Sequence, residues 1–400
     1  ICHQNNIGVI LDWVPGHFTK DAHGLYEFDG TPCYEYSDTR KMEHEGWGTR
    51  VFDYGRNEVK SFLTSSAVSW IEDYHIDGIR VDAVSSMLFL NYCRDEDKCA
   101  RNIYGGFENL EAIDFIKNLN LYVKENYPGV SMIAEESTSY PKVTAAVEHG
   151  GLGFDFKWNM GWMNDSLDYI EENPIYRQWS HNKLTFSMCY AFVENFILPI
   201  SHDEVVHLKK SLLDKFPVGY DDKFSNYKTF LGYMFAHPGK KLTFMGTEIP
   251  QFIEWDENKE LDWMLLDFPS HYNAHRFAQE LNQYYRKTPA LWQQDGGWEG
   301  FEWHVVDDAS HNVFAFSRKA ADGQEVLVIS NFSGENWGQY SIGFHDERSY
   351  KMALNSDAKK FGGQGIVNRN LKTKQQQCGE FPYTLQLTIP AFSTMYLEKK

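Results

Sequence analysis

Two opposite charges interrupt an apolar stretch near residue 80. Arg80 and Asp82 stand two positions apart in IDGIRVDAV (76–84), whose β-branched residues predict a buried strand. Residues i and i+2 of a strand share one face, so we expect both side chains to point the same way. Burying a lone charge is costly, whereas a hydrogen-bonded pair is tolerated, so the pair by itself leaves a purely structural role open.

Carboxylates also follow other apolar stretches. Glu135 lies near the end of VSMIAEE (130–136), and Asp203 ends FILPISHD (196–203). Carboxylates that share a site raise each other's pKa, so one stays protonated while its neighbour stays ionised. Cleavage of a glycosidic bond needs such a pair, because one carboxylate attacks the sugar while a carboxylic acid protonates the leaving oxygen. An arginine beside the attacking carboxylate would hold it ionised.

Short apolar runs predict the elements that must position these residues. The runs lack the polar alternation of a half-exposed strand, and such runs are typical of buried parallel strands. They cover residues 7–13, 76–82, 130–136, 196–203 and 241–248, with a weaker candidate at 153–160. Helices are predicted between them, over 58–75 and 108–128, because apolar residues recur there at three- and four-residue spacing. Alternation of strand and helix predicts a parallel α/β fold.

Several polar residues stand at the predicted carboxyl ends of these strands: Asp12, Asp82, Glu135, His202, Asp203 and Glu248. Loops converge at that face of a parallel (β/α)8 TIM-type barrel. An open doubly wound sheet also binds ligands at its carboxyl edge, but the sequence has no G-x-G-x-x-G or P-loop motif. From about residue 293, short alternating segments predict an antiparallel β-sandwich. We therefore expect a barrel domain over 1–294 and a C-terminal all-β domain over 295–400.

Composition and spacing narrow the classes of partner and cofactor. The net charge of −18 argues against a nucleic acid or an anionic membrane as partner. No apolar run is long enough to span a membrane. The six cysteines are irregularly spaced without a C-x-x-C pair, which predicts free thiols in a reducing cytoplasm. HDEVVH (202–207) places its histidines five residues apart instead of four, so we expect no zinc site there.

Two further sets of residues are assigned structural roles. Glu136 and Glu204 each follow a candidate catalytic carboxylate and should point to the opposite side of the strand. The aromatic residues of FKWNMGWM (156–163) could stack on sugar rings, but their spacing favours packing in the core.

Four motifs resemble the four short sequence regions of the α-amylase superfamily of glycosidases and transglycosidases: DWVPGH (12–17), GIRVDAV (78–84), AEES (134–137) and SHDEVVH (201–207). Longer segments are similar to the bacterial glycogen (1,4-α-glucan) branching enzymes of that superfamily, namely 150–170, 176–186 and 194–215. The resemblance extends from residue 7 to the C-terminus.

The resemblance implies a role for each matching residue. Asp82 matches the family's nucleophile, Glu135 its general acid/base, and Asp203 the third carboxylate, which binds sugar hydroxyls and stabilises the transition state. The substrate-binding and supporting positions fall on Arg80, His17, His202 and Asp12. These residues include no metal ligand set, and the family's mechanism needs no cofactor.

The resemblance also implies an activity and a partner. We expect a retaining transglycosylase that cleaves α-1,4-glucosidic bonds of an α-glucan such as glycogen or amylose and forms α-1,6 branches. An amylase-like α-1,4-glucan hydrolase with the same catalytic residues, or a non-catalytic carbohydrate-binding relative, remains open. The chain starts at what resembles the third strand of the barrel, so we expect an N-terminal part of the same enzyme to precede it.

Overall fold

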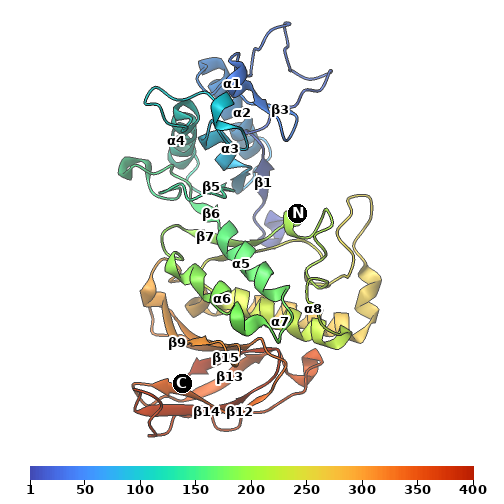
Figure 1. The fold of residues 1–400 in the computed structure, drawn as a ribbon, viewed down its shortest axis with the longest axis vertical. Helices are drawn as coiled ribbons and strands as arrows, with labels where there is room; N and C mark the ends of the chain where they lie inside the picture. The colour runs from blue at the N-terminus through green and yellow to red at the C-terminus, as the bar shows by residue number, and fades with distance from the viewer. The chain divides into compact units, whose positions relative to one another are not determined.

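The computed structural model describes residues 1–400, which divide into two compact units. The first comprises Ile1–Trp158 with Val193–Asn195, and the second comprises Asn159–Phe192 with Phe196–Lys400. Figure 1 draws both units, coloured from blue at the N-terminus to red at the C-terminus.

Four parallel strands form the centre of the first unit, in the order β1 (Ile10–Trp13), β4 (Gly78–Val81), β5 (Ser131–Ala134) and β6 (Phe156–Trp158). Each lies inside an apolar run that predicted a strand. All four residues of β4 are buried, which explains why its sequence lacks polar alternation. The register pairs Asp12 with Arg80, so these two residues stand side by side on neighbouring strands.

Two long helices of the first unit match the predicted ones. Helix α2 (Asn57–Glu72) buries a stripe of residues at four-residue spacing, and α4 (Leu110–Asn126) begins where the side chain of Asn109 accepts a hydrogen bond from the backbone N–H of Ala112. Both contribute to one apolar core around β4 and β5. The short elements of this unit are α1 (Thr39–Met42), β2 (Glu43–His44), β3 (Thr49–Arg50), α3 (Val84–Leu88) and the 3₁₀ turns His3–Asn5, Glu96–Lys98 and Val147–His149.

The second unit begins with the helical segments α5 (Met160–Ile170) and α6 (Asn182–Phe186) and contains the parallel strand pair β7 (Phe196–Ile200) and β8 (Lys240–Thr243). Helices α7 (Tyr220–Ala236) and α8 (Pro269–Lys287) follow β7 and β8 respectively. The prediction that Glu248 ends a strand is wrong. Strand β8 stops at Thr243, because the chain then turns through Gly246, whose φ is +85°.

The C-terminal part of the second unit is all-β, as predicted. One antiparallel sheet has the order β13-β15-β11-β10-β9, and β12 and β14 form a second. Apolar residues from both sheets meet in one core, which includes Ile329, Ile342 and Leu385. The strands are β9 (Phe301–Asp308), β10 (Val313–Lys319), β11 (Glu325–Asn331), β12 (Trp337–Phe344), β13 (Tyr350–Asn355), β14 (Tyr383–Ile389) and β15 (Ser393–Lys399).

Helix α7 packs closely on strand β15. The hydroxyl of Thr394 donates to the carbonyl of Thr229 at 2.9 Å, and the hydroxyl of Tyr396 donates to the carbonyl of Gly232. A Cβ atom added at Gly232 would lie 2.7 Å from Cβ of Thr394, so only glycine fits this contact. Helix and sheet of this unit therefore share one continuous core.

The whole chain was searched for membrane-spanning helices and for disulfide bonds. No helix combines the length and the apolar character needed to cross a bilayer. All six cysteines are free thiols.

We expect Gly232→Ala to lower the free energy of unfolding by about 1–3 kcal/mol, the usual cost of overpacking a tight core. The measurement is the denaturant midpoint of the purified protein. Gly338→Ala is the control, because nothing lies within 4 Å of a Cβ at that position. Equal midpoints for the two variants would contradict this account of the contact between α7 and β15.

Candidate active site

One buried guanidinium gathers three carboxylates at the carboxyl ends of β1, β4 and β5. Arg80 is 5% exposed, and its Nη1 lies 2.6 Å from an oxygen of Asp12 and 2.6 Å from an oxygen of Asp82. Its Nη2 lies 3.5 Å from Oε2 of Glu135. The guanidinium carbon stands 4.3 Å from the ring centroid of Trp158, the last residue of β6. Arg80 and Asp82 therefore do point the same way, and Glu135 joins them.

The charges explain why burial of this arginine is tolerated. Burial by itself lowers the pKa of Arg80, but the hydrogen bond and negative charge of Asp12, together with the charges of Asp82 and Glu135, raise that pKa above its ordinary value. The charged guanidinium in turn holds the side chains of Asp82 and Glu135 close together.

Backbone contacts between β4 and β5 fix the two candidate catalytic carboxylates as neighbours. The N–H of Glu135 donates to the carbonyl of Val81, and the N–H of Val84 donates to the carbonyl of Glu135. The N–H of Ala83 also donates to Oε2 of Glu135 at 2.7 Å. Ala83 has a φ of +47°, a conformation that residues other than glycine rarely adopt. The turn after Asp82 is thus held in a strained form that aims an N–H at Glu135.

His17 completes this group from the loop after β1. Its Nε2 lies 3.8 Å from Oδ2 of Asp82, and its Nδ1 lies 3.1 Å from the hydroxyl oxygen of Thr49. Burial lowers the pKa of His17, and the opposing effect of Asp82 is smaller. His17 is therefore a neutral hydrogen-bonding group at pH 7. The ring of His44 lies 5.2 Å from that of His17, and its Nε2 donates to the carbonyl of Gly16.

A second buried ion pair involves Glu136, the residue that follows Glu135. The Nζ of Lys157 is 2.6 Å from Oε2 of Glu136, and the two side chains are 7% and 0% exposed. The hydroxyl of Ser85, just after the Asp82 turn, donates to Glu136 at 2.7 Å, and Thr138 also donates to Glu136. Glu136 therefore ties the segments after β4 and β5 to β6.

Asp203 and His202 lie in the second unit, in a one-turn 3₁₀ helix (His202–Glu204) directly after β7. Glu204 turns inward and accepts from both the N–H and the hydroxyl of Ser201 at 2.7 Å. The side chains of His202 and Asp203 are 43% and 53% exposed, and His202 Nε2 lies 3.4 Å from Oδ1 of Asp203. Asp203 is thus presented to solvent on a capped turn.

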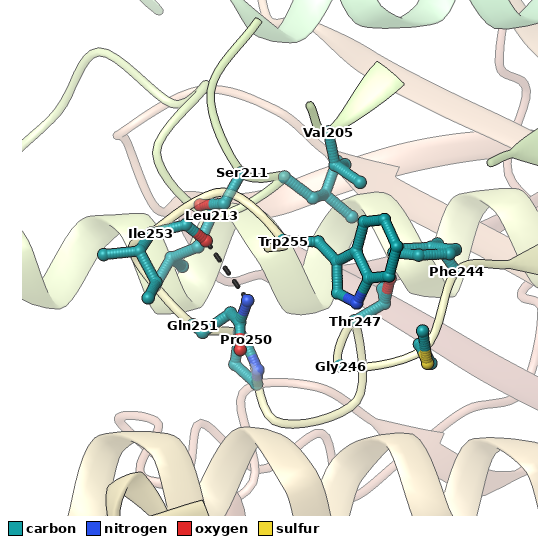
Figure 2. A pocket seen from close by; sticks show the side chains of 12 residues that line it. Val205, Ser211, Leu213, Phe244, Gly246, Thr247, Pro250, Gln251, Ile253 and Trp255 are labelled. Carbon is teal, nitrogen blue, oxygen red and sulfur yellow. Dashed lines mark hydrogen bonds between the residues drawn. The ribbon is translucent and has the colours of Figure 1, made fainter. Parts of the chain in front are cut away.

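A small aromatic cavity adjoins this turn. The rings of His202 and Phe244 are 6.3 Å apart, and the ring of Trp255 meets that of Phe244 edge-on at 5.3 Å (Figure 2). The cavity that Phe244 and Trp255 line with Val205 has a volume of about 20 Å³. That is room for one water molecule and not for a sugar ring.

The structure brings several of the predicted site residues together and adds three participants. The structure brings Asp12, His17, Arg80, Asp82 and Glu135 together, and it groups His202 with Asp203 separately in the second unit. Lys157, Ser85 and the strained turn at Ala83 were not predicted. A signal for Lys157 existed, because it is a charge inside the apolar run 153–160, as Arg80 is in its own run. Trp158 and Trp162 are buried, in agreement with the packing interpretation.

The chain was compared with known proteins. The model of the C-terminal all-beta domain of alpha amylase matches residues 303–400. A 1,4-alpha-glucan branching enzyme of Clostridium perfringens (strain SM101) is 51% identical over 400 residues, which are 99% of this chain and 59% of that protein. The branching enzyme of Halothermothrix orenii is 52% identical over 399 residues, 99% of this chain and 63% of that protein. This chain is similar to 1,4-alpha-glucan branching enzymes. The resemblance predicted from the motifs is confirmed.

The similarity covers only part of the length of these enzymes, and it extends to a solved structure at the level of the fold. The chain spans about three fifths of the length of these branching enzymes, at 59% and 63%. The crystal structure of an Anoxybacillus alpha-amylase matches with a TM-score of 0.64 at 15% identity, covering 99% of this chain and 76% of that one. This likeness shows an alpha-amylase-like fold.

We expect Lys157→Met to lower the free energy of unfolding by about 3–5 kcal/mol, because it leaves the Glu136 carboxylate buried without a cation. Denaturant titration measures the loss. The double variant Lys157→Met/Glu136→Gln should recover part of it, since the amide keeps hydrogen-bonding capacity without charge. Lys60→Met, which breaks an exposed pair with Asp114, should cost less than about 1 kcal/mol. A double variant as unstable as the single one would contradict this interpretation.

The burial of His44 predicts a pH dependence of stability. Burial, with smaller effects of the neighbouring His17 and Arg94, lowers the pKa of His44 from 6.5 to about 4. Between these values the unfolded chain binds more protons than the folded one, so stability falls as the pH drops from 6.5 towards 4, by at most about 1.4 kcal/mol per pH unit from this residue. His44→Gln should show a shallower loss in urea midpoints across that window. An unchanged slope would exclude His44 as a contributor.

Proposed function

We propose that this chain carries the catalytic region of a glucan branching transglycosylase, which cleaves an α-1,4-glucosidic bond and transfers the released chain to a 6-hydroxyl of a glucan. The observation that carries the proposal is the single guanidinium of Arg80 in contact with both Asp82 and Glu135. A retaining mechanism needs two closely placed carboxyl groups of different roles, and this contact supports such a pair. The printed names of the similar proteins support the substrate class.

In the first step Asp82 attacks C1 of the glucose unit at the cleavage point. The bond from C1 to the departing O4 breaks while Glu135 transfers its proton to O4, and a covalent glucosyl ester forms on Asp82. Contact with Arg80 holds the carboxylate of Asp82 in position for this attack. The N–H of Ala83 holds one carboxyl oxygen of Glu135 in position.

In the second step the 6-hydroxyl of another glucan unit attacks C1. Glu135 accepts the hydroxyl proton, the bond to Asp82 breaks, and the new C1–O6 bond is the α-1,6 branch. Two inversions at C1 leave its configuration unchanged. If water took the place of the acceptor, the same residues would perform hydrolysis, so retention of the acceptor and exclusion of water decide the product.

The remaining candidate residues are assigned to binding. His17, neutral at pH 7, hydrogen-bonds a sugar hydroxyl beside Asp82, and Asp12 helps to hold Arg80. We assign Asp203 and His202 to the binding of sugar hydroxyls. Their exposed position on a capped turn after a parallel strand supports this assignment. Every step uses only these side chains and the substrate hydroxyls.

The finer architecture belongs to the same proposal. The parallel strands are those of a (β/α)8 barrel from about its third strand onward, with the domain boundary at 294/295, and an N-terminal part of the same enzyme is a partner of this chain. The all-β strands from Phe301 onward and the greater length of the similar enzymes support this arrangement. Six free thiols support a location in the reducing cytoplasm.

The test is the reaction of the full-length protein with amylose. We expect it to lower the absorbance of the glucan–iodine complex with few new reducing ends, and Asp82→Ala should abolish turnover because it removes the nucleophile, a loss of at least about 10⁴-fold. Glucan binding should survive in this variant. Asp114→Ala is the matched control, because this exposed carboxylate on α4 pairs only with Lys60.

Each alternative outcome has its own signature. Release of reducing ends in proportion to the loss of iodine colour would identify a hydrolase instead. Glucan binding without turnover in the unaltered protein would identify a non-catalytic relative. Full turnover by Asp82→Ala would refute the nucleophile assignment.

A further inference from the structure

An exposed tryptophan stands at the tip of the hairpin formed by β2 and β3. Trp47 is 47% exposed, whereas the nearby core aromatics Phe52 and Tyr54 are 5% and 0% exposed. Exposed apolar side chains are common on protein surfaces, so exposure alone indicates nothing. The position of this side chain, and the way in which its hairpin is held, are the informative features.

The hairpin is anchored at its base on the loop that carries His17. Nε2 of His44, in β2, lies 3.1 Å from the carbonyl of Gly16, and the hydroxyl of Thr49, in β3, lies 3.1 Å from Nδ1 of His17. The N–H groups of Trp47 and Gly48 both donate to the carbonyl of His44, which closes the turn. The indole therefore sits on a short, well-bonded turn, and its placement costs little entropy when a ligand binds.

Only one ring separates this indole from the candidate nucleophile. The rings of Trp47 and His17 meet edge-on, with centroids 4.5 Å apart at an angle of 81°. Nε2 of His17 in turn lies 3.8 Å from Oδ2 of Asp82. The ring of Tyr92 also lies near the indole, with centroids 5.8 Å apart. All these residues belong to the first unit.

The chemistry of the ligand matches such a surface. A pyranose ring exposes C–H groups on its faces, and a flat aromatic side chain covers them without needing their hydroxyls. Tryptophan offers the largest rigid face of any side chain and loses few rotamers on binding. A sugar bound at Asp82 and His17 has neighbours along its chain, and the indole of Trp47 lies directly beyond the ring of His17.

We infer that Trp47 is a sugar-stacking residue, which holds the glucose unit of an α-1,4-glucan chain adjacent to the unit attacked by Asp82. The inference rests on the proposed function for its ligand class, and it assigns a binding role to a residue outside the four motifs. Trp47 contributes to binding of the chain and not to bond cleavage, because it touches no reacting atom. Its loss should therefore raise KM and leave kcat nearly unchanged.

The experiment compares Trp47→Ala and Trp47→Phe with the unaltered full-length protein. We expect Trp47→Ala to raise KM for amylose about tenfold, with kcat within about twofold, and Trp47→Phe to raise KM by about twofold or less because a smaller aromatic face remains. Binding of maltoheptaose, measured by calorimetry without turnover, should weaken in the same order. Thermal unfolding establishes that both variants fold.

The matched control is Tyr122→Ala. Tyr122 is an aromatic residue of similar exposure, 42%, near the carboxyl end of α4, which leads into the amino-terminal end of β5. It stands at the opposite end of the strand from the candidate site, so KM and maltoheptaose affinity should not change.

The outcomes separate this inference from the proposed function. If the unaltered protein branches amylose but Trp47→Ala keeps its KM and its affinity for maltoheptaose, the stacking role is overturned while the function stands. If the protein shows no branching but maltoheptaose binding still depends on Trp47, the function fails and the stacking role stands. A fall in kcat with unchanged KM would also overturn the inference, because it would place Trp47 in the chemical step.

Discussion

Everything at the candidate site depends on the burial of one positive charge. The guanidinium of Arg80 stays ionised at any physiological pH, so a position in which it is 5% exposed is stable only with anions around it. Three carboxylates meet that need, and each comes from the end of a different parallel strand. The contacts that make the arginine's burial possible also bring the carboxyl groups of Asp82 and Glu135 close together.

A second ion pair, between Glu136 and Lys157, stabilises the segment that follows β5. Glu135 and Glu136 are consecutive, and each lies against a different cation: Arg80 for Glu135 and Lys157 for Glu136. The hydroxyl of Ser85 reaches Glu136, while the N–H of Ala83 reaches Glu135. The turn after Asp82 is therefore held by hydrogen bonds to both glutamates, which explains how the left-handed conformation of Ala83 persists.

The loop after β1 and the hairpin of β2 and β3 add an exposed surface to which a polymer could bind. The hairpin of β2 and β3 bonds to Gly16 and His17, so the loop after β1 and the hairpin behave as one piece. In this way a single imidazole connects the charged group around Asp82 to the exposed indole of Trp47. A polar centre flanked by a rigid aromatic face is the combination that binding of an uncharged, hydroxyl-rich chain demands.

The sequence by itself determined the local elements and the residue types at the strand ends. Apolar runs located the strands, three- and four-residue spacing located α2 and α4, and motifs identified Arg80, Asp82 and Glu135, because burial and side-chain direction leave a periodic trace in neighbouring residues. Tertiary structure alone decided three features: the end of β8 before Glu248, the pairing of Glu136 with Lys157, and the place of Trp47 beside His17. Each joins segments about 20 or more residues apart or depends on a loop conformation, and the order of strands and the path of loops leave no such trace in the local pattern.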